Sequence, residues 1–132
     1  MRQAWRKERD GAYRYAKTRG WRVNVIEPMQ RAPNVRDLLT FWKPQGCIVE
    51  CSGRDSGYFD PVQFGKTPVV WLGRDPRTLP QSASYVNPAP AGHGERAVRE
   101  FLSAGFTNFA FLASTSDQFW SRDREADFIR TL

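Results

Sequence analysis

The sequence predicts an α/β fold, specifically a doubly wound three-layer sandwich built on a mostly parallel sheet. Two observations predict this class. Short apolar runs typical of strands alternate along the chain with segments of helical period, and several runs lack the polar alternation of a solvated strand. The chain has 132 residues, of which 40% are hydrophobic and 26% are charged, so its length allows one packed core.

The first predicted element is a helix that ends before Gly20, a residue suited to the left-handed cap of a helix. Its inward residues share the spacing of one helical face: Trp5, Ala12, Tyr13 and Ala16. Residues 21–25 then alternate between apolar and polar side chains, which predicts a strand. A second helix follows, capped by Asn34 and closed by Pro44. Its apolar residues again lie on one face: Val35, Leu38, Leu39 and Trp42.

The rest of the chain is expected to alternate in the same way. Four further strands are predicted from short apolar runs, at residues 47–49, 67–72, 83–86 and 108–112. Residues 59–64 can hold one helical turn, and residues 91–104 predict a helix that Gly105 closes. The final helix carries residues at intervals of four along one face: Trp120, Arg124, Phe128 and Leu132.

The charge of the chain is positive, with 20 Lys and Arg against 14 Asp and Glu, a formal net charge of +6. Much of the excess falls near the start of the chain, at Arg2, Arg6, Lys7, Arg9, Arg14, Lys17, Arg19 and Arg22. We interpret this cluster as the solvated face of one amphipathic helix, because no groove-reading motif or base-stacking pattern accompanies it. The alternative is a basic nucleic-acid-binding module, whose DNA binding would depend steeply on salt.

Several function classes lack the residues that they need. No uncharged apolar run is long enough for a membrane span, and no apolar signal core follows Met1, so we expect neither membrane partner nor export. Cys47 and Cys51 lie out of disulfide reach in one predicted strand, which fits a reducing cytoplasm. His93 is the single histidine, and it forms no triad or metal cluster. We therefore predict a protein without enzyme activity, metal or cofactor.

The ordered set of elements is similar to a known family. Its best stretch, AVREFLSAGFTNFAFLAS…FWSRDREADFIRTL in residues 97–132, reads as helix, glycine turn, strand, loop and a Trp-x-x-x-Arg-x-x-x-Phe helix. With RDGAYRYAKTRGW, GCIVEC and FGKTPVVWLGRDP, it resembles the sensor domain of LacI/GalR-like regulators and periplasmic sugar-binding proteins. The resemblance is greatest to bacterial xylose-operon regulators, and it covers nearly the whole chain.

The resemblance implies a single lobe of a two-lobe periplasmic-binding-protein-like fold. Residues 1–132 would be a partial N-terminal lobe without its first strand and without the second lobe. The complete regulator would be a cytoplasmic homodimer that binds a small xylose-like sugar between its lobes and contacts operator DNA through a module outside this chain. Because one lobe supplies part of a closing cleft, we expect negligible sugar affinity here. Two alternatives stay open: a fragment of an exported sugar-binding protein, or a small flavodoxin-like α/β enzyme domain.

The resemblance and the residue types together point to Arg124 and Trp120 as ligand-binding residues. Arg124 is expected in the first turn of the last helix, just after the strand at residues 108–112, where its forked donors suit sugar hydroxyls. Trp120 would offer a flat face for stacking on a sugar ring. The alternative is an arginine paired with Asp123 or Asp127, beside a tryptophan of the core.

Three more candidates follow predicted strands at the carboxyl edge of the sheet, where open parallel sheets bind ligands. Arg74 and Asp75 follow residues 67–72, with Gly73 standing where the family often has an aspartate. Their alternative is a loop salt bridge. Glu50 directly follows the strand at residues 47–49, before a loop at residues 52–55, and its alternative is a solvated turn. Another departure from the family is Ala89 and Pro90, which stand where an Asp-Asn pair is common.

Overall fold

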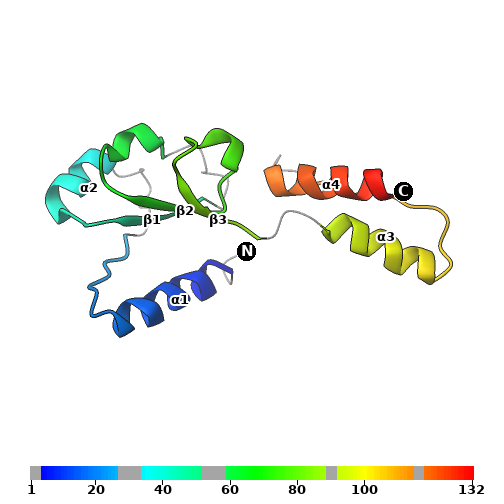
Figure 1. The fold of residues 1–132 in the computed structure, drawn as a ribbon, viewed down its shortest axis with the longest axis horizontal. Coiled ribbons are helices and arrows are strands. Elements are labelled where there is room, and N and C mark those ends of the chain that lie inside the picture. Colours follow the sequence, from blue (N-terminus) through cyan, green and yellow to red (C-terminus); the bar gives the residue numbers. More distant parts are fainter. Residues whose placement is uncertain (1–3, 27–33, 52–58, 89–91, 115–117) are drawn as a thin grey trace. The chain divides into compact units, whose positions relative to one another are not determined.

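The computed structural model describes residues 4–26, 34–51, 59–88, 92–114 and 118–132. These residues form mixed helix and strand, with a small parallel sheet (Figure 1). This agrees with the α/β class that the sequence predicts. The chain divides into two compact units, Met1–Lys43 and Pro44–Leu132.

The first unit contains helices α1 (Ala4–Thr18) and α2 (Val35–Trp42), close to their predicted positions. Helix α2 begins as expected, since the Asn34 side chain accepts a hydrogen bond from the Arg36 amide at 3.0 Å. Gly20 follows the end of α1 with a φ of 64°, as the cap prediction requires.

The strand predicted at residues 21–25 is wrong, because the end of α1 uses the residue that should begin it. The Trp21 amide donates to the Ala16 carbonyl at 2.9 Å, which is the long hydrogen bond of a Schellman motif. The Trp21 ring packs edge-on against Tyr15, with ring centroids 5.6 Å apart. No described strand pairs with this segment, so its backbone has no interstrand hydrogen bonds among the described residues.

The second unit contains the sheet, with strands β1 (Cys47–Glu50), β2 (Val69–Leu72) and β3 (Ser84–Val86). All pairs are parallel, in the order β1-β2-β3, and the three strands fall within or beside their predicted ranges. The register aligns Val49, Trp71 and Tyr85 on one face of the sheet. Val49 and Trp71 are buried there, and Phe64 packs edge-on against Trp71 at 5.4 Å.

Two short 3-10 helices lie in the crossovers between the strands. The first, η1 (Pro61–Phe64), lies between β1 and β2, and it is the helical turn predicted at residues 59–64. The second, η2 (Pro76–Thr78), lies between β2 and β3. Each begins with an aspartate whose side chain accepts an amide hydrogen bond, from Val62 for Asp60 and from Arg77 for Asp75.

Helices α3 (His93–Ser103) and α4 (Phe119–Thr131) pack side by side (Figure 1). Both were predicted from the sequence, and Gly105 follows α3 in the left-handed conformation expected of it. Helix α4 begins at Phe119, so Arg124 lies in its second turn and the prediction of the first turn is wrong.

The strand predicted at residues 108–112 is also wrong. Residues 106–114 have no described ladder partner, and aromatic contacts hold the run instead. Phe109 and Phe111 lie against Phe128 of α4, with centroid distances of 6.3 and 5.7 Å. An apolar run becomes a strand only where a neighbouring strand accepts its hydrogen bonds, and here its side chains pack on a helix.

Asp127 joins the two helices through the amino end of α3. Its buried side chain accepts hydrogen bonds from the backbone amides of Gly92, Gly94 and Glu95 at 3.0–3.2 Å. These amides have no partner within a helix, and α3 has no side-chain cap of its own. The pKa of Asp127 lies below its ordinary value. The largest cause is the hydrogen bond from the Glu95 amide, followed by those from the Gly94 and Gly92 amides and by the charge of Arg130.

Gly94 allows the close approach that this capping needs. A Cβ at this position would lie 2.3 Å from the Phe128 amide nitrogen and 2.8 Å from the Arg124 carbonyl oxygen. Both atoms belong to the backbone of α4 and cannot rotate away. Only glycine therefore fits between α3 and α4 at this point.

Alanine substitutions at Gly94 and Gly11 should change stability in opposite directions. Gly94→Ala forces the helices apart and should lower the free energy of unfolding by roughly 1–3 kcal/mol. Gly11 lies inside α1 with open space around it, so Gly11→Ala should raise helix stability by about 1 kcal/mol. Urea denaturation followed by circular dichroism measures both, and a Gly94→Ala protein as stable as the parent would contradict the close packing.

Replacing Asp127 by asparagine should reveal a pH-dependent contribution to stability. Because the folded protein lowers the pKa of this carboxyl, its stabilisation is complete above the unfolded value of about 3.9 and is lost as pH falls through the lower folded value. The stability gap between the parent and Asp127→Asn should therefore narrow in acid. Urea titrations at neutral and acidic pH measure it, with Glu125→Gln on the same helix as control. A gap independent of pH would contradict the capping role.

Candidate functional site

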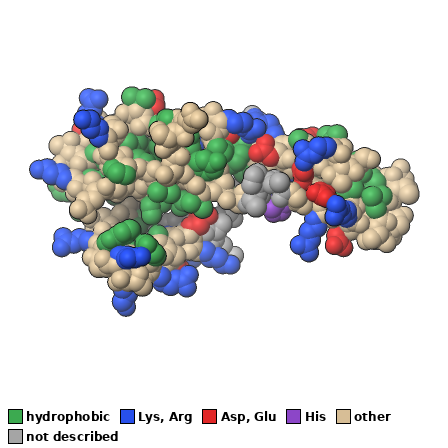
Figure 2. Space-filling model, in the orientation of Figure 1, with side chains coloured by type: hydrophobic (Ala, Val, Ile, Leu, Met, Phe, Trp, Pro, Cys, Tyr) green, Lys and Arg blue, Asp and Glu red, His purple; other side chains and the backbone are tan. Residues whose placement is uncertain are grey.

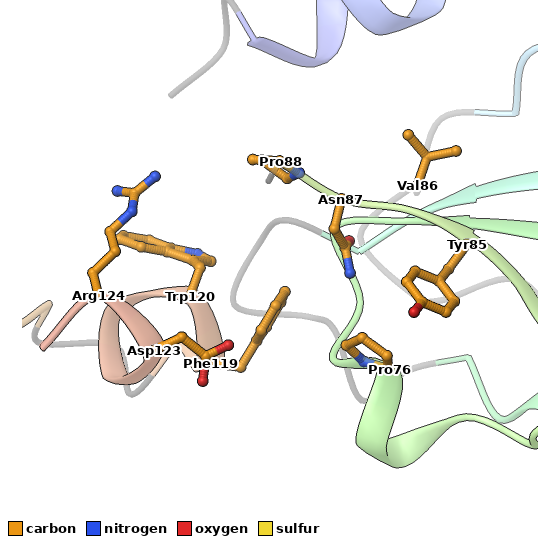
Figure 3. Close-up of a pocket in the computed structure, with 9 residues that line it drawn as sticks. All are labelled: Pro76, Tyr85, Val86, Asn87, Pro88, Phe119, Trp120, Asp123 and Arg124. Carbon is orange, nitrogen blue, oxygen red and sulfur yellow. The ribbon is translucent and has the colours of Figure 1, made fainter. Parts of the chain in front are cut away.

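A pocket of about 370 Å³ lies between the carboxyl end of β3 and the start of α4 (Figure 3). Tyr85, Val86 and Pro76 line it from the sheet and its crossover, while Phe119 and Trp120 line it from α4. This volume is at the lower end of the range of small-molecule sites, about 300–1,000 Å³. The mainly apolar wall with a few polar groups is the usual composition of such sites.

Arg124 and Trp120, the first two predicted site residues, both line this pocket. The Arg124 guanidinium lies 4.9 Å from the centroid of the Trp120 ring, one helical turn away (Figure 3). It therefore covers one face of the indole and leaves the remaining surface of the ring toward the pocket. A ligand that stacks on Trp120 must use the side that Arg124 does not cover.

The expected alternative partners of Arg124 are engaged elsewhere. Asp127 forms its ion pair with Arg130, and Asp123 forms its ion pair with Arg77 at 3.2 Å. Within the described part of the chain, no carboxylate pairs with Arg124. Among the described residues, its guanidinium donors thus lack the salt bridge that a purely structural role would use.

Arg77 connects the crossover after β2 to helix α4. Its Nε donates to the Asp75 carboxylate at 2.8 Å, and its Nη1 lies 3.2 Å from the Asp123 carboxylate. Arg122 of α4 approaches Asp75 from the other side, at 3.9 Å. This group of four charges, which we term the charged bridge, holds one wall of the pocket against the other.

Asp75 is part of the charged bridge and does not line the pocket. Its Oδ1 accepts hydrogen bonds from the amide and the side chain of Arg77. The hydrogen bond from the Arg77 side chain is the main reason why the pKa of Asp75 lies below its ordinary value. The structure thus gives Asp75 the loop salt bridge that the sequence left as its alternative.

Arg74 organises the carboxyl edge of the sheet through contacts outside the pocket. Its guanidinium stacks over Trp71 at 4.8 Å and donates to the carbonyl of Phe59. Arg74 also hydrogen-bonds the Cys51 side chain. Burial raises the pKa of the Cys51 thiol, and the charge and hydrogen bond of Arg74 lower it by a smaller amount. These contacts commit Arg74 to positioning, and it does not line the pocket.

Glu50 ends β1, at the far edge of the sheet from β3, and is exposed. It does not line the pocket. The loop at residues 52–55 and the residues Ala89 and Pro90 lie outside the described residues. The structure therefore brings Arg124 and Trp120 to one site and places Arg74, Asp75 and Glu50 away from it.

Asn87 is a site residue that sequence reasoning missed. Its Nδ2 donates to the Arg74 carbonyl at 2.8 Å, while its buried Oδ1 has no hydrogen-bond partner among the described residues. An unsatisfied buried acceptor beside a pocket is unusual, because such a group loses its hydration without compensation. The available signal was its position, directly after the last residue of β3.

The described residues contain neither a grouping of three or more His, Cys, Asp or Glu side chains suited to a metal ion nor a helix long and apolar enough to cross a bilayer. Both cysteines are free thiols. The polar groups that line the pocket include the Arg124 guanidinium and the Asp123 carboxylate, beside aromatic surfaces.

Replacing Arg77 by glutamine should raise the pKa of Asp75 toward its ordinary value of about 3.9. The reason is that Arg77 supplies the largest of the interactions that stabilise the ionised carboxylate. A carboxyl ¹³C NMR titration measures this pKa directly, and Arg96→Gln on the exposed side of α3 is the control. An unchanged Asp75 titration in Arg77→Gln would show that the charged bridge does not form in solution.

Comparison with protein-family models, with curated proteins and with solved structures gives no match for this chain. The similarity to sugar-responsive regulators thus rests on the sequence pattern alone. What the structure adds is a mixed α/β fold with a three-stranded parallel sheet and the pocket beside it.

Proposed function

We propose that the second unit forms one wall of a sugar-binding cleft, in the ligand-sensing lobe of a LacI/GalR-like transcription regulator. In this proposal the lobe belongs to a doubly wound, periplasmic-binding-protein-like domain, and its ligand is a small xylose-like sugar. The complete protein is a cytoplasmic homodimer without enzyme activity, and a module outside this chain binds operator DNA.

The observation that carries the proposal is the placement of Arg124. Its guanidinium sits on Trp120 at the pocket, without a carboxylate partner among the described residues. Sugars present hydroxyl groups at their edges and apolar C–H faces, so they are recognised by forked donors beside an aromatic ring. The Asn87 side chain also lines the pocket, and its Oδ1 has no hydrogen-bond partner among the described residues.

The position and electrostatics of the pocket support a neutral ligand. It lies at the carboxyl end of a parallel strand, where open α/β sheets bind their ligands. Asp123 lines it together with Arg124, so an anionic ligand would meet a carboxylate as well as a guanidinium. This mixture favours an uncharged polar molecule over a phosphate or a nucleotide.

The proposal predicts weak binding that is confined to the pocket. Since the second wall of the cleft is contributed by another lobe, xylose should give no measurable heat in calorimetry. At saturating xylose, NMR should show shifts at the Trp120 indole N–H and the Asn87 side-chain amide. Arg124→Ala should abolish these shifts, while Arg96→Ala should keep them.

Two results would overturn the proposal. Tight stoichiometric binding of a sugar would contradict a cleft whose second wall is contributed by another lobe. A panel of pentoses and hexoses that leaves the Trp120 and Asn87 signals unmoved at saturating concentration would contradict sugar as the ligand class.

A further inference from the structure

The positive charge of this protein is segregated in its first unit. Residues 1–43 contain 11 of the 20 Lys and Arg residues and 4 of the 14 Asp and Glu residues, a net charge of +7. Residues 44–132 contain 9 Lys and Arg residues and 10 Asp and Glu residues, a net charge of −1. The whole positive excess of the chain therefore belongs to the first unit. In Figure 2, Lys and Arg side chains surround α1, whereas both signs mix over α3 and α4.

Within this unit, four cations share one face of α1. At about 100° per residue, they fall within an arc of about 100°. We term them the basic face: Arg6, Lys7, Arg14 and Lys17. All four are exposed, and none pairs with a carboxylate in the described part of the chain. Asp10 is the one acidic residue within the arc, and it lies 3.7 Å from Arg9.

This arrangement is unfavourable for the helix by itself. The first turn of α1 contains no acidic residue and includes Arg6 and Lys7, although the positive end of a helix dipole repels cations. Arg14 and Lys17 are three residues apart, at a spacing where like charges repel each other. A polyanion along this face would relieve both repulsions at once.

A nucleic acid fits this face better than a bilayer does. A helix that lies on a membrane needs a broad apolar side opposite its cations. In α1 the side chains opposite the basic face include Ala12 and Ala16, which are small, and Ala16 is already buried. Glu8 and Arg9 flank these small residues, so the described side chains of α1 offer no broad apolar face.

We infer that α1 binds the phosphate backbone of a nucleic acid through its basic face. The contact is sequence-independent, because phosphates carry no base identity. It adds a second, weaker DNA contact to the one expected from a module outside the chain, and it does not depend on the sugar pocket.

The test is fluorescence anisotropy of the full chain with a labelled random-sequence DNA duplex at increasing salt. Four phosphate contacts should give a slope of about −3 to −4 for log affinity against log salt concentration. A variant with all four basic-face residues changed to glutamine should lose more than about tenfold in affinity at low salt and flatten this slope. Glutamine preserves helix propensity, and circular dichroism confirms that α1 persists.

A matched control separates the basic face from net charge. Its substitutions remove the same charge at exposed positions elsewhere: Arg36→Gln, Lys66→Gln, Arg96→Gln and Arg99→Gln. This variant should bind the duplex nearly as the parent does. Equal losses in both variants, or a parent without salt-dependent binding, would overturn the inference. Tighter binding to phosphatidylserine vesicles than to the duplex would overturn it in favour of a membrane.

Discussion

The carboxylate of Asp127 is the interaction on which the candidate site depends. It caps the amino end of α3 from the side of α4 and so fixes the two helices together. One turn earlier on α4, Asp123 reaches Arg77 and connects the helix to the crossover after β2. Because these two acids are engaged by Arg130 and Arg77, Arg124 between them is left to lie on Trp120. The pairing of charges along one helix thus determines which guanidinium the pocket presents.

Much of the fold could be predicted because its signals are local. Asn34 before α2 and Gly20 after α1 act through hydrogen bonds within a few residues, and both caps form as the sequence indicates. The two failed strands show the limit of such reasoning. Residues 21–25 and 108–112 have the pattern of strands, but a strand also needs a partner, and no pattern within one segment reveals whether a neighbour is present.

The candidate site shows the same difference between local signals, which the sequence reveals, and contacts with distant residues, which it does not. Their spacing of four predicted that Trp120 and Arg124 share one helical face, and the structure places both at one pocket. Arg74 and Asp75 were correctly placed after a strand, yet their hydrogen bonds go to Phe59 and Arg77, contacts that residue type alone does not predict. Asn87 was missed because its significance lies in an oxygen that neighbouring groups leave unsatisfied.

The exposure of the charged bridge has a consequence for how the pocket responds to its surroundings. The side chains of Arg77 and Asp123 are 60% and 31% exposed, so dissolved ions reach the pair that joins the two walls. At physiological ionic strength the screening length is about 8 Å, and it shortens as salt increases. The separation between the end of β3 and α4 thus depends partly on the ionic strength of the solution. Added salt should weaken the binding of any ligand in the pocket.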